Sequence, residues 1–414
     1  MSPRTNGRAS KSVLLISYFY PPMPGAGPLR PGRLAKLLPD FGWTPTTLTG
    51  PWRGAGPDFG EVVALSPLGD PFAARIPKLR RIVSPPARWF PKALPAALSL
   101  ATRRPFDAVV SISNPVCNHM IASITAQHFG IPWLADYSEA WSGNRFAEKS
   151  ALAARTNRLL ETRCMAGATA ITCATPGIRS LLSKLHGRSD IEVIENAVDL
   201  TEWEHIPSVA PATFTMLFAG MLWGGRLTPD LLFAATAKLR DAGHPAGAAA
   251  CFEFYCYEHR LVLEAARRYN LEGALTLHPI SLRDDVLRAE RRSAALIILF
   301  PMQPISVIPS KLYEFYGARR PILAIGPEQS KVQLGGLIEG NRLGSFVTSE
   351  DECAAAICAL YERFRAGRYD TDPNPAWSPP TAQTTTRRFA EVLDRIAGST
   401  PSRELGALPI ESLA

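Results

Sequence analysis

The 414-residue chain is 46% hydrophobic and 20% charged, the composition of a globular protein rather than of a disordered or fibrous one. Its length exceeds what one hydrophobic core ordinarily supports, so we expect two domains. The net charge of +8 favours acidic partners, namely phosphates, anionic lipid or nucleic acid, without choosing among them. Seven cysteines with no Cys-x-x-Cys pair argue against a disulfide framework and a zinc site, and they suit a reducing cytosol.

The N-terminal segment does not have the pattern of a targeting signal. A basic start leads into an apolar run from Val13 to Tyr20, which is too short and too aromatic for a signal peptide. The sequence also lacks an apolar window of about 18 residues, the minimum for a membrane-spanning helix. We therefore predict a cytoplasmic protein.

Short apolar runs alternate with helical stretches along the chain, which is the pattern of parallel sheets wrapped by helices. In the first half the strand-like runs are SVLLISYFY, TPTTLTG, FDAVVSIS, IPWLADYS, ATAITCAT and DIEVIENAV. These runs suffice for one complete Rossmann-like domain over residues 1–198.

A second series of the same kind follows a linker, predicted from Asp199 to Thr213. Its strand-like runs are FTMLFAGML, CFEFYCYE, ALTLHPI, AALIILF and PILAIG. Residues 370–386, rich in Pro and Thr, are predicted to form a crossover loop, and a last helix follows at about residues 387–397. Two similar α/β halves in tandem are the skeleton of an enzyme with a cleft between its domains.

A glycine-rich loop, Gly25-Ala26-Gly27, follows the first strand and precedes a helix. Glycines there allow backbone N–H groups to approach a ligand, and the helix N-terminus adds positive partial charge. The spacing does not match a dinucleotide-binding fingerprint. A glycine-rich turn without a ligand is the alternative. Arg30 and Arg33 open the following helix, where they could reach an anion or lie at the surface.

The stretch from residue 75 to residue 104 is strongly basic and contains no acid. Its cations are interleaved with apolar residues such as Trp89 and Phe90. Such a segment could lie on an anionic membrane face, where each cation contributes about 1 kcal/mol. A solvated loop and helix with ordinary packing aromatics is an equal alternative. Because no recognised nucleic-acid-binding motif is present, we do not expect a nucleic acid partner.

Two acids, Asp136 and Glu139, lie at the end of the run IPWLADYSEAW. Ligands bind at the carboxyl ends of strands in open α/β sheets. These carboxylates could therefore orient a substrate hydroxyl or act as a general base. The alternative is that they cap the next helix, as Asp commonly does.

The segment PISVIPSKLYEFYGARRPILAIGP is the most informative part of the chain. Pro309 and Ser310 predict a helix start, with Ser310 as the N-cap. Lys311 then falls in the first turn, where the helix dipole disfavours a cation unless an anion compensates. Glu314 lies three residues later on the same face. Lys311 could meet a phosphate while Glu314 accepts ribose hydroxyls; a plain i,i+3 ion pair is the alternative.

This segment resembles the donor-binding motif of family 4 GT-B glycosyltransferases. FAGMLWGGRLTPDLLFAA is similar to a second hallmark of that family, a strand that ends in Gly and is followed by a basic residue near the diphosphate. Further similar passages are SYFYPPMPGAGPLRPGRLAKLLPDFGW, FDAVVSISNP, GIPWLADYSEAW and VIENAVD. They occur in the family's order from about Lys11 to Phe364, and their agreement makes the resemblance specific.

The resemblance implies an α/β fold of the GT-B type, with two facing Rossmann-like domains and a central cleft. Residues 1–198 would form the acceptor-side domain and residues 211–375 the nucleotide-sugar donor domain. Residues 376–398 would form a helix that crosses back to the first domain, and residues 399–414 a mobile tail.

The resemblance also implies roles for single residues. Glu314 would hold the donor ribose, and Arg226 and Lys311 would neutralise the diphosphate leaving group. The other donor-binding positions would be Gly25, Gly27, Gly220 and Ser310, and the other catalytic candidates Asp136 and Glu139. Charge stabilisation by Arg and Lys is the expected main catalytic effect, with no metal and no cofactor.

Departures from the family pattern leave the activity open. Ser306 stands where the family has a second acid, and Ser138 stands where it has an Arg. The expected activity is transfer from a nucleotide-sugar to a lipid-linked or saccharide acceptor in polysaccharide biosynthesis, with retention of configuration. The protein would be cytoplasmic and peripheral on the inner face of the cell membrane. The alternatives are a nucleotide-sugar epimerase of the same fold and a degenerate, non-catalytic partner subunit.

Overall fold

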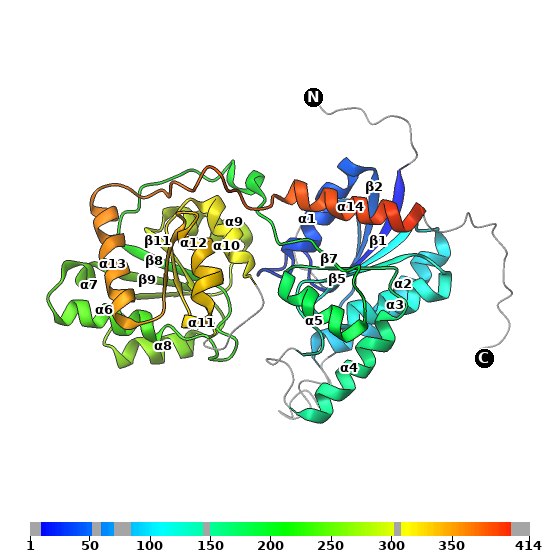
Figure 1. Ribbon diagram of the computed structural model, residues 1–414, viewed down its shortest axis with the longest axis horizontal. Helices are drawn as coiled ribbons and strands as arrows, with labels where there is room; N and C mark the ends of the chain where they lie inside the picture. The colour runs from blue at the N-terminus through cyan, green and yellow to red at the C-terminus, as the bar shows by residue number, and fades with distance from the viewer. Residues whose placement is uncertain (1–9, 52–58, 70–83, 144–149, 302–307, 399–414) are drawn as a thin grey trace.

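The computed structural model describes residues 10–51, 59–69, 84–143, 150–301 and 308–398 and shows two α/β domains, each built on one parallel sheet (Figure 1). The predicted α/β class with two Rossmann-like halves is confirmed. The tail predicted over residues 399–414 lies outside the described residues, as do residues 75–83 of the basic stretch and Ser306.

The N-terminal domain has a seven-stranded sheet in the order β3-β2-β1-β4-β5-β6-β7. Its strands are β1 (Lys11–Ser17), β2 (Trp43–Thr49), β3 (Glu61–Ala64), β4 (Ala108–Ser113), β5 (Trp133–Tyr137), β6 (Ala170–Cys173) and β7 (Glu192–Val193). All six residues of β4 are buried, because helices cover both faces of a parallel sheet. The strand order reverses between β1 and β4, and such a switch point opens a crevice for ligands at the carboxyl ends of the strands.

Five helices accompany this sheet within the described residues. They are α1 (Leu29–Leu37), α2 (Pro85–Arg103), α3 (Cys117–Phe129), α4 (Ala151–Met165) and α5 (Pro176–His186). Helix α1 follows the glycine-rich loop after β1, so its first turn lies at the carboxyl edge of the sheet. This places the start of α1 at the switch point.

The C-terminal domain has a six-stranded sheet in the order β10-β9-β8-β11-β12-β13. Its strands are β8 (Thr215–Ala219), β9 (Cys251–Tyr255), β10 (Leu275–His278), β11 (Ala295–Leu299), β12 (Ile322–Ile325) and β13 (Gly344–Val347). The helices that accompany it are α6 (Asp230–Asp241), α7 (Pro245–Ala249), α8 (His259–Arg268), α9 (Arg283–Arg292), α10 (Ser310–Ala318), α11 (Glu328–Ser330), α12 (Gly336–Glu339) and α13 (Glu350–Arg365). Its switch point lies between β8 and β11, and α10 starts beyond the carboxyl end of β11.

The chain passes between the domains twice. The first passage contains a short 3₁₀ helix (Leu200–Trp203), and Trp203 packs into the core of the C-terminal domain beside Phe315. A Cβ at Gly317 would lie 2.1 Å from the Trp203 indole nitrogen, so only glycine allows this approach. The second passage ends in α14 (Ala382–Gly398), which lies across the N-terminal domain and buries Leu393 in its core (Figure 1).

None of the helices within the described residues is both long and apolar enough to cross a membrane.

Candidate functional site

The carboxyl edge of the N-terminal sheet and the start of α10 meet in the gap between the domains. Ala26 of the glycine-rich loop, Arg30 and Arg33 of α1, and Ser310 of α10 line one small cavity there. Its volume is about 30 Å³, which is room for a water molecule and far too little for a nucleotide-sugar. The structure therefore brings the predicted glycine-rich loop and the predicted donor helix together around this cavity.

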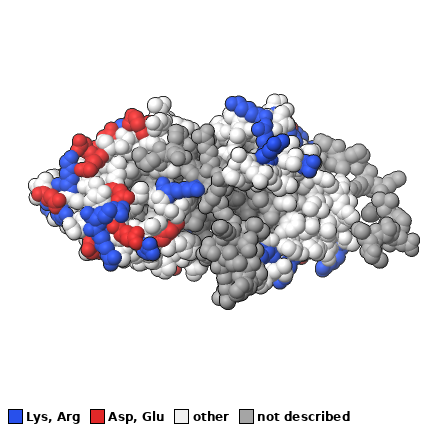
Figure 2. Space-filling view, turned by 90° about the horizontal axis from the view of Figure 1, so that it is seen from below, with Lys and Arg blue, Asp and Glu red and all other residues white. Residues whose placement is uncertain are grey.

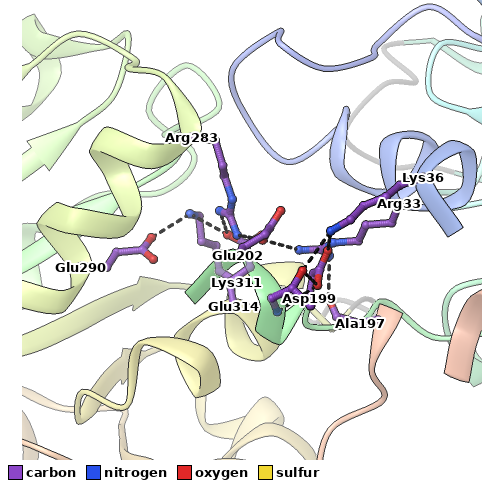
Figure 3. Close-up of polar contacts among 10 residues, drawn as sticks. Arg33, Lys36, Ala197, Asp199, Glu202, Arg283, Glu290, Lys311 and Glu314 are labelled. Carbon is purple, nitrogen blue, oxygen red and sulfur yellow. Dashed lines mark hydrogen bonds and ion pairs between the residues drawn. The ribbon is translucent and has the colours of Figure 1, made fainter. Parts of the chain in front are cut away.

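Glu314 is the most enclosed charged group of the donor helix. Its side chain is fully buried, and its Oε2 accepts hydrogen bonds from Arg283 Nη1 at 2.7 Å and Lys311 Nζ at 3.1 Å (Figure 3). Its other oxygen, Oε1, is buried and has no partner among the described residues. A buried carboxylate oxygen without a donor is costly, so Glu314 offers an open acceptor position.

A second buried acid, Glu290 of α9, shares Lys311 with Glu314. Lys311 Nζ lies 3.2 Å from Glu290 Oε1, and Glu290 Oε2 has no partner within the described part of the chain. The predicted i,i+3 pair of Lys311 and Glu314 is thus present, but it is one edge of a larger cluster. The second acid was not predicted, because it lies on a different helix from the motif.

The two buried acids respond to this cluster in opposite ways. Burial favours the neutral form of Glu314, yet Lys311 and Arg283 outweigh it and hold the pKa of Glu314 well below its usual range. Burial raises the pKa of Glu290, and Lys311 and Arg283 only partly offset that effect. For Lys311, the two carboxylates outweigh burial and raise its pKa. Glu314 is therefore ionised, and Glu290 is the first of the pair to take a proton as pH falls.

The cluster continues into the N-terminal domain. Arg283 Nη2 lies 2.8 Å from Glu202 Oε2, and the same oxygen lies 3.1 Å from Arg33 Nη2 on α1. Figure 3 shows this row of alternating charges running from α9 and α10 through the interdomain passage to α1. Three cations face three carboxylates in it, so the charges balance before any ligand arrives. Arg283 could have been suspected as the first residue of a helix after a strand end, whereas Glu202 has no sequence signal.

Asp136 occupies a different environment. It is fully buried at the end of β5, and Arg30 binds both of its oxygens, with Nε at 2.7 Å and Nη2 at 2.8 Å. Thr172 donates a third hydrogen bond at 2.8 Å. The Asp136 carboxylate is therefore saturated by protein groups, and the same contact explains why Arg30 lies inward instead of on the surface.

Glu139 lies two residues beyond β5 and has fewer partners. Its Oε2 accepts a hydrogen bond from the Asn114 side-chain amide at 2.6 Å. Burial raises the pKa of Glu139, and the Asn114 hydrogen bond only partly offsets it. A carboxyl group with a raised pKa at a strand end is suited to hold or release a proton.

The loop after β8 carries the remaining predicted donor residues, Gly220 and Arg226. The Gly220 N–H donates to the Tyr255 carbonyl at 3.0 Å, and a Cβ at Gly220 would lie 3.3 Å from the Phe218 ring. The Glu258 carboxylate accepts the N–H groups of residues 222 and 224 and so fixes the loop. Arg226 is exposed in this loop. That it joins Lys311 at one diphosphate stays a prediction.

The starts of α1 and α10 show one expected and one unexpected feature. Gly25 has φ +101°, which favours glycine, and a Cβ at Gly27 would lie 3.3 Å from the Phe19 ring. Ser310 was expected to cap α10, and this was wrong. Ser310 is the first helical residue, Pro309 occupies the cap position, and no side chain caps the helix. The proline has no hydroxyl, so the first N–H groups of α10 have no side-chain acceptor from the cap.

The basic stretch is only partly described, and its best aromatic candidate is not exposed. Trp89 on α2 is fully buried, with its indole N–H donating to the Thr49 carbonyl at 3.2 Å. It cannot serve as the membrane-facing aromatic that the sequence suggested, because it packs in the core. Throughout the described residues, no group of three or more His, Cys, Asp and Glu side chains is arranged to hold a metal ion.

Comparisons with known proteins agree with this geometry. Residues 29–197 match the model of the glycosyl transferase 4-like domain. Among solved structures, sucrose-phosphate synthase from Thermosynechococcus elongatus superposes with a TM-score of 0.62 and 14% identity, over 94% of this chain and 96% of that one. HepE of Anabaena in complex with UDP-glucose superposes with a TM-score of 0.57 and 13% identity, over 94% of this chain and 97% of HepE. A putative UDP-N-acetylglucosamine 2-epimerase from Listeria monocytogenes superposes with a TM-score of 0.58 and 13% identity, over 95% of this chain and 98% of the epimerase.

No curated protein sequence matches the chain significantly. The two facing parallel sheets and these structural matches define a GT-B fold. Residues 29–197 are similar to the glycosyl transferase 4-like domain, and the predicted resemblance to GT-B glycosyltransferases is confirmed. The chain thus has the fold of GT-B glycosyltransferases.

Proposed function

We propose that the chain transfers a sugar, with retention of configuration and without a metal ion, from a nucleotide-sugar held by the C-terminal domain to a saccharide or lipid-linked acceptor held by the N-terminal domain. The observation that carries the proposal is the buried Glu314, whose Oε1 lacks a partner among the described residues while Lys311 stands beside it in the first turn of α10.

Glu314 has the properties that a ribose requires. An ionised carboxylate only accepts hydrogen bonds, and the two vicinal hydroxyls of a ribose are donors. The pKa of Glu314 is held well below its usual range by Lys311 and Arg283 in spite of burial, so the group stays ionised. Arg283 is a positioning residue in this arrangement, because it fixes Oε2 and leaves Oε1 for the ligand.

Lys311 supplies the charge that a departing diphosphate needs. It sits in the first turn of a helix whose N-terminus favours anions, and Arg226 extends from the loop after β8 at the same edge of the sheet. Cations that meet the charge developing on the leaving group lower the barrier to transfer. Because Glu290 and Glu314 now neutralise Lys311, donor binding would shift Lys311 from Glu290 toward the diphosphate.

The enclosure of Glu314 and the small size of the cavity at Ser310 favour a movement of the domains. A cavity of about 30 Å³ cannot hold a nucleotide-sugar, and Glu314 is enclosed. We propose that the domains part to admit the donor and close again around it. Closure would bring the glycine-rich loop of α1 back against the transferred sugar and exclude water from it.

Apolar side chains at the donor edge fit a nucleobase. Trp223 in the loop after β8 is 41% exposed, and Tyr257 after β9 is 66% exposed. Aromatic rings that remain exposed beside a polar, charged site are suited to stack on a planar ring.

The experiment compares donor turnover in Lys311→Ala and Glu314→Ala with the unchanged protein. A thermal-shift panel of nucleotide-sugars first selects the donor, because a ligand that binds only the folded state raises its melting temperature. We expect turnover to fall at least about a hundredfold in both variants. Lys331→Ala is the matched control, since Lys331 also pairs with a glutamate, Glu352, in the same domain. Unchanged turnover in both test variants would refute the proposal.

Product analysis separates transfer from epimerisation. The putative epimerase from Listeria shares the fold, and an epimerase converts its nucleotide-sugar without an acceptor. We expect free nucleoside diphosphate to appear only when an acceptor or water takes the sugar. A partner subunit without catalytic activity would release none even though it binds the donor.

We further propose that the acceptor is presented at an anionic membrane, with the N-terminal domain facing it. Residues 1–198 hold 23 Lys and Arg against 12 Asp and Glu, whereas residues 199–414 hold 22 against 25, so the positive excess belongs entirely to the first domain. On the face in Figure 2, acidic and basic side chains intermingle on the C-terminal domain, and acidic ones are scarce on the other.

Helix α4 offers the best described contact with such a surface. Leu152 is 76% and Leu159 50% exposed, and the exposed Arg155 and Arg158 lie between them in the sequence. Apolar side chains flanked by arginines favour anionic bilayers. We expect Leu159→Asp to reduce binding to vesicles of anionic phospholipid, while Val332→Asp, at a still more exposed apolar site of the other domain, does not. Equal binding by both variants would count against this orientation.

A further inference from the structure

A larger cavity lies at the opposite edge of the C-terminal sheet from Lys311. Its volume is about 390 Å³, and it is lined by linker residues 208–210, by Arg320, by Arg363 in the last turn of α13, and by residues 367–370 and Asp372 after that helix. Arg320 lies two residues before β12 and the linker precedes β8, which places the cavity at the amino ends of the strands. Both passages between the domains therefore border it.

One buried arginine, Arg320, holds the wall of this cavity together through its hydrogen bonds. Arg320 is only 1% exposed, and its Nε donates to the Arg291 carbonyl at 2.9 Å. Its Nη2 donates to the Val209 carbonyl at 2.6 Å, and its Nη1 pairs with Asp370. A single guanidinium thus ties the linker to the segment that follows α13.

Positive charge exceeds negative charge along the lining. Arg363 and Arg368 join Arg320, while the lining acids are Asp370 and Asp372. Asp372 is already paired with Arg342 at 3.4 Å. Of the two lining acids, only Asp370 thus remains to balance the charge of the three lining arginines.

Two more observations show that this charge is under-compensated. Arg363 contacts Asp370 only through the backbone carbonyl, at 2.8 Å, and its Nε is buried without a partner in the described parts of the chain. Burial lowers the pKa of Arg320, and repulsion from Arg291 adds to this although Asp370 opposes it. An added anion would satisfy the free N–H and balance the charge.

We propose that this cavity binds a small molecule that carries a phosphate monoester, at a site separate from the donor site. Guanidinium forks match the oxygens of a phosphate, and arginine is the side chain best suited to hold them. The volume is within the range of small-molecule sites and exceeds what a bare phosphate fills, so it leaves room for an organic part. The ligand would touch both interdomain passages and stabilise their present arrangement.

The experiment measures the melting temperature of the full chain with inorganic phosphate and with glucose 6-phosphate, at constant ionic strength and with glucose as the neutral control. The test variant carries Arg363→Gln and Arg368→Gln, which are less buried than Arg320 and whose removal leaves the linker contacts in place. Lys311→Ala reports on the donor site. Circular dichroism establishes that each variant is folded.

We expect a saturable rise in melting temperature with a phosphate probe but not with glucose. Binding should weaken about tenfold or more in the double variant, because charge-assisted hydrogen bonds are lost, and persist in Lys311→Ala. The proposal is overturned if neither probe gives a saturable shift, if the double variant responds like the unchanged protein, or if Lys311→Ala abolishes the response.

Discussion

Two buried acids, one in each domain, differ in how they are satisfied. Asp136, at the carboxyl end of β5, accepts three hydrogen bonds from Arg30 and Thr172. Glu314, beyond the carboxyl end of β11, has one oxygen bound by Arg283 and Lys311 and the other without a partner among the described residues. A saturated carboxylate holds the fold together, whereas an unsaturated one is prepared to accept a ligand.

The largest expected effect is on stability at the saturated site. The Asp136→Asn substitution leaves the buried Arg30 guanidinium without a carboxylate partner. This should lower the free energy of unfolding by about 3–5 kcal/mol. Urea denaturation followed by circular dichroism measures this loss. Asp190→Asn, in the exposed Arg188–Asp190 pair, should cost less than about 1 kcal/mol. Equal losses in the two variants would remove the distinction drawn for Asp136.

A buried histidine beside Asp136 should make the N-terminal domain sensitive to acid. His119 is fully buried, and burial lowers its pKa from 6.5 to about 4, although Glu161 and Asp136 partly oppose this. The folded state therefore resists protonation, so its stability is intact above pH 6.5 and is lost as pH falls toward 4. The loss should reach up to about 3 kcal/mol. Denaturation at several pH values should show a flatter pH dependence in His119→Asn and an unchanged one in His128→Asn, at the exposed end of the same helix.

The acid beside Glu314 should couple nucleotide binding to proton uptake. Burial raises the pKa of Glu290, and a diphosphate drawn to Lys311 would raise it further. Affinity for a nucleoside diphosphate should therefore fall as pH rises, by up to about tenfold per pH unit for one linked proton. Calorimetry at several pH values, in buffers of different ionisation heat, measures the uptake.

Glu290→Gln should abolish this proton uptake, because its side chain is permanently neutral. Glu272→Gln, an exposed acid of the same domain, should leave the uptake unchanged. Persistence of the full uptake in Glu290→Gln would assign the proton to another group.

The smallest expected effect concerns the link between the two regions. Glu202→Gln weakens the contacts with Arg33 and Arg283 and should lower the free energy of unfolding by about 1–2 kcal/mol, since a charge-assisted hydrogen bond becomes a neutral one. Nucleotide affinity should change little, because Glu202 does not contact Glu314 directly. Glu204→Gln is the control, because Glu204 lies two residues after Glu202 and its side chain is exposed. A large loss of affinity in Glu202→Gln alone would show that the two regions act as one site.

The sequence predicted the fold because each buried parallel strand is a short apolar run that can be recognised from neighbouring residues alone. Runs such as FDAVVSIS and AALIILF are apolar on both faces, and the structure buries β4 and β11 accordingly. The Lys311–Glu314 pair was also predictable, since it lies within one helical turn. Such signals need only neighbouring residues.

The sequence could not predict which residues bind each acid, or which carboxylate is left with an oxygen that has no partner. Arg30 lies 106 positions from Asp136, and Glu290 lies 21 positions from Lys311, so no local pattern joins them. The sequence placed Asp136 at a strand end and Glu314 on a helix, but it did not indicate which of the two carboxylates would be saturated. The sequence left both alternatives open for Trp89 for a related reason, because which face of a basic helix is buried depends on what packs against it.

The most direct measurement is the affinity of the selected nucleoside diphosphate and of its 2′,3′-dideoxy analogue for the unchanged protein and for Glu314→Gln. If Glu314 accepts the ribose hydroxyls, the unchanged protein binds the natural nucleotide at least about tenfold more tightly than the analogue. In Glu314→Gln that preference should largely disappear while the protein stays folded. An equal preference in both proteins would show that the ribose lies elsewhere and that the open oxygen of Glu314 is not the donor site.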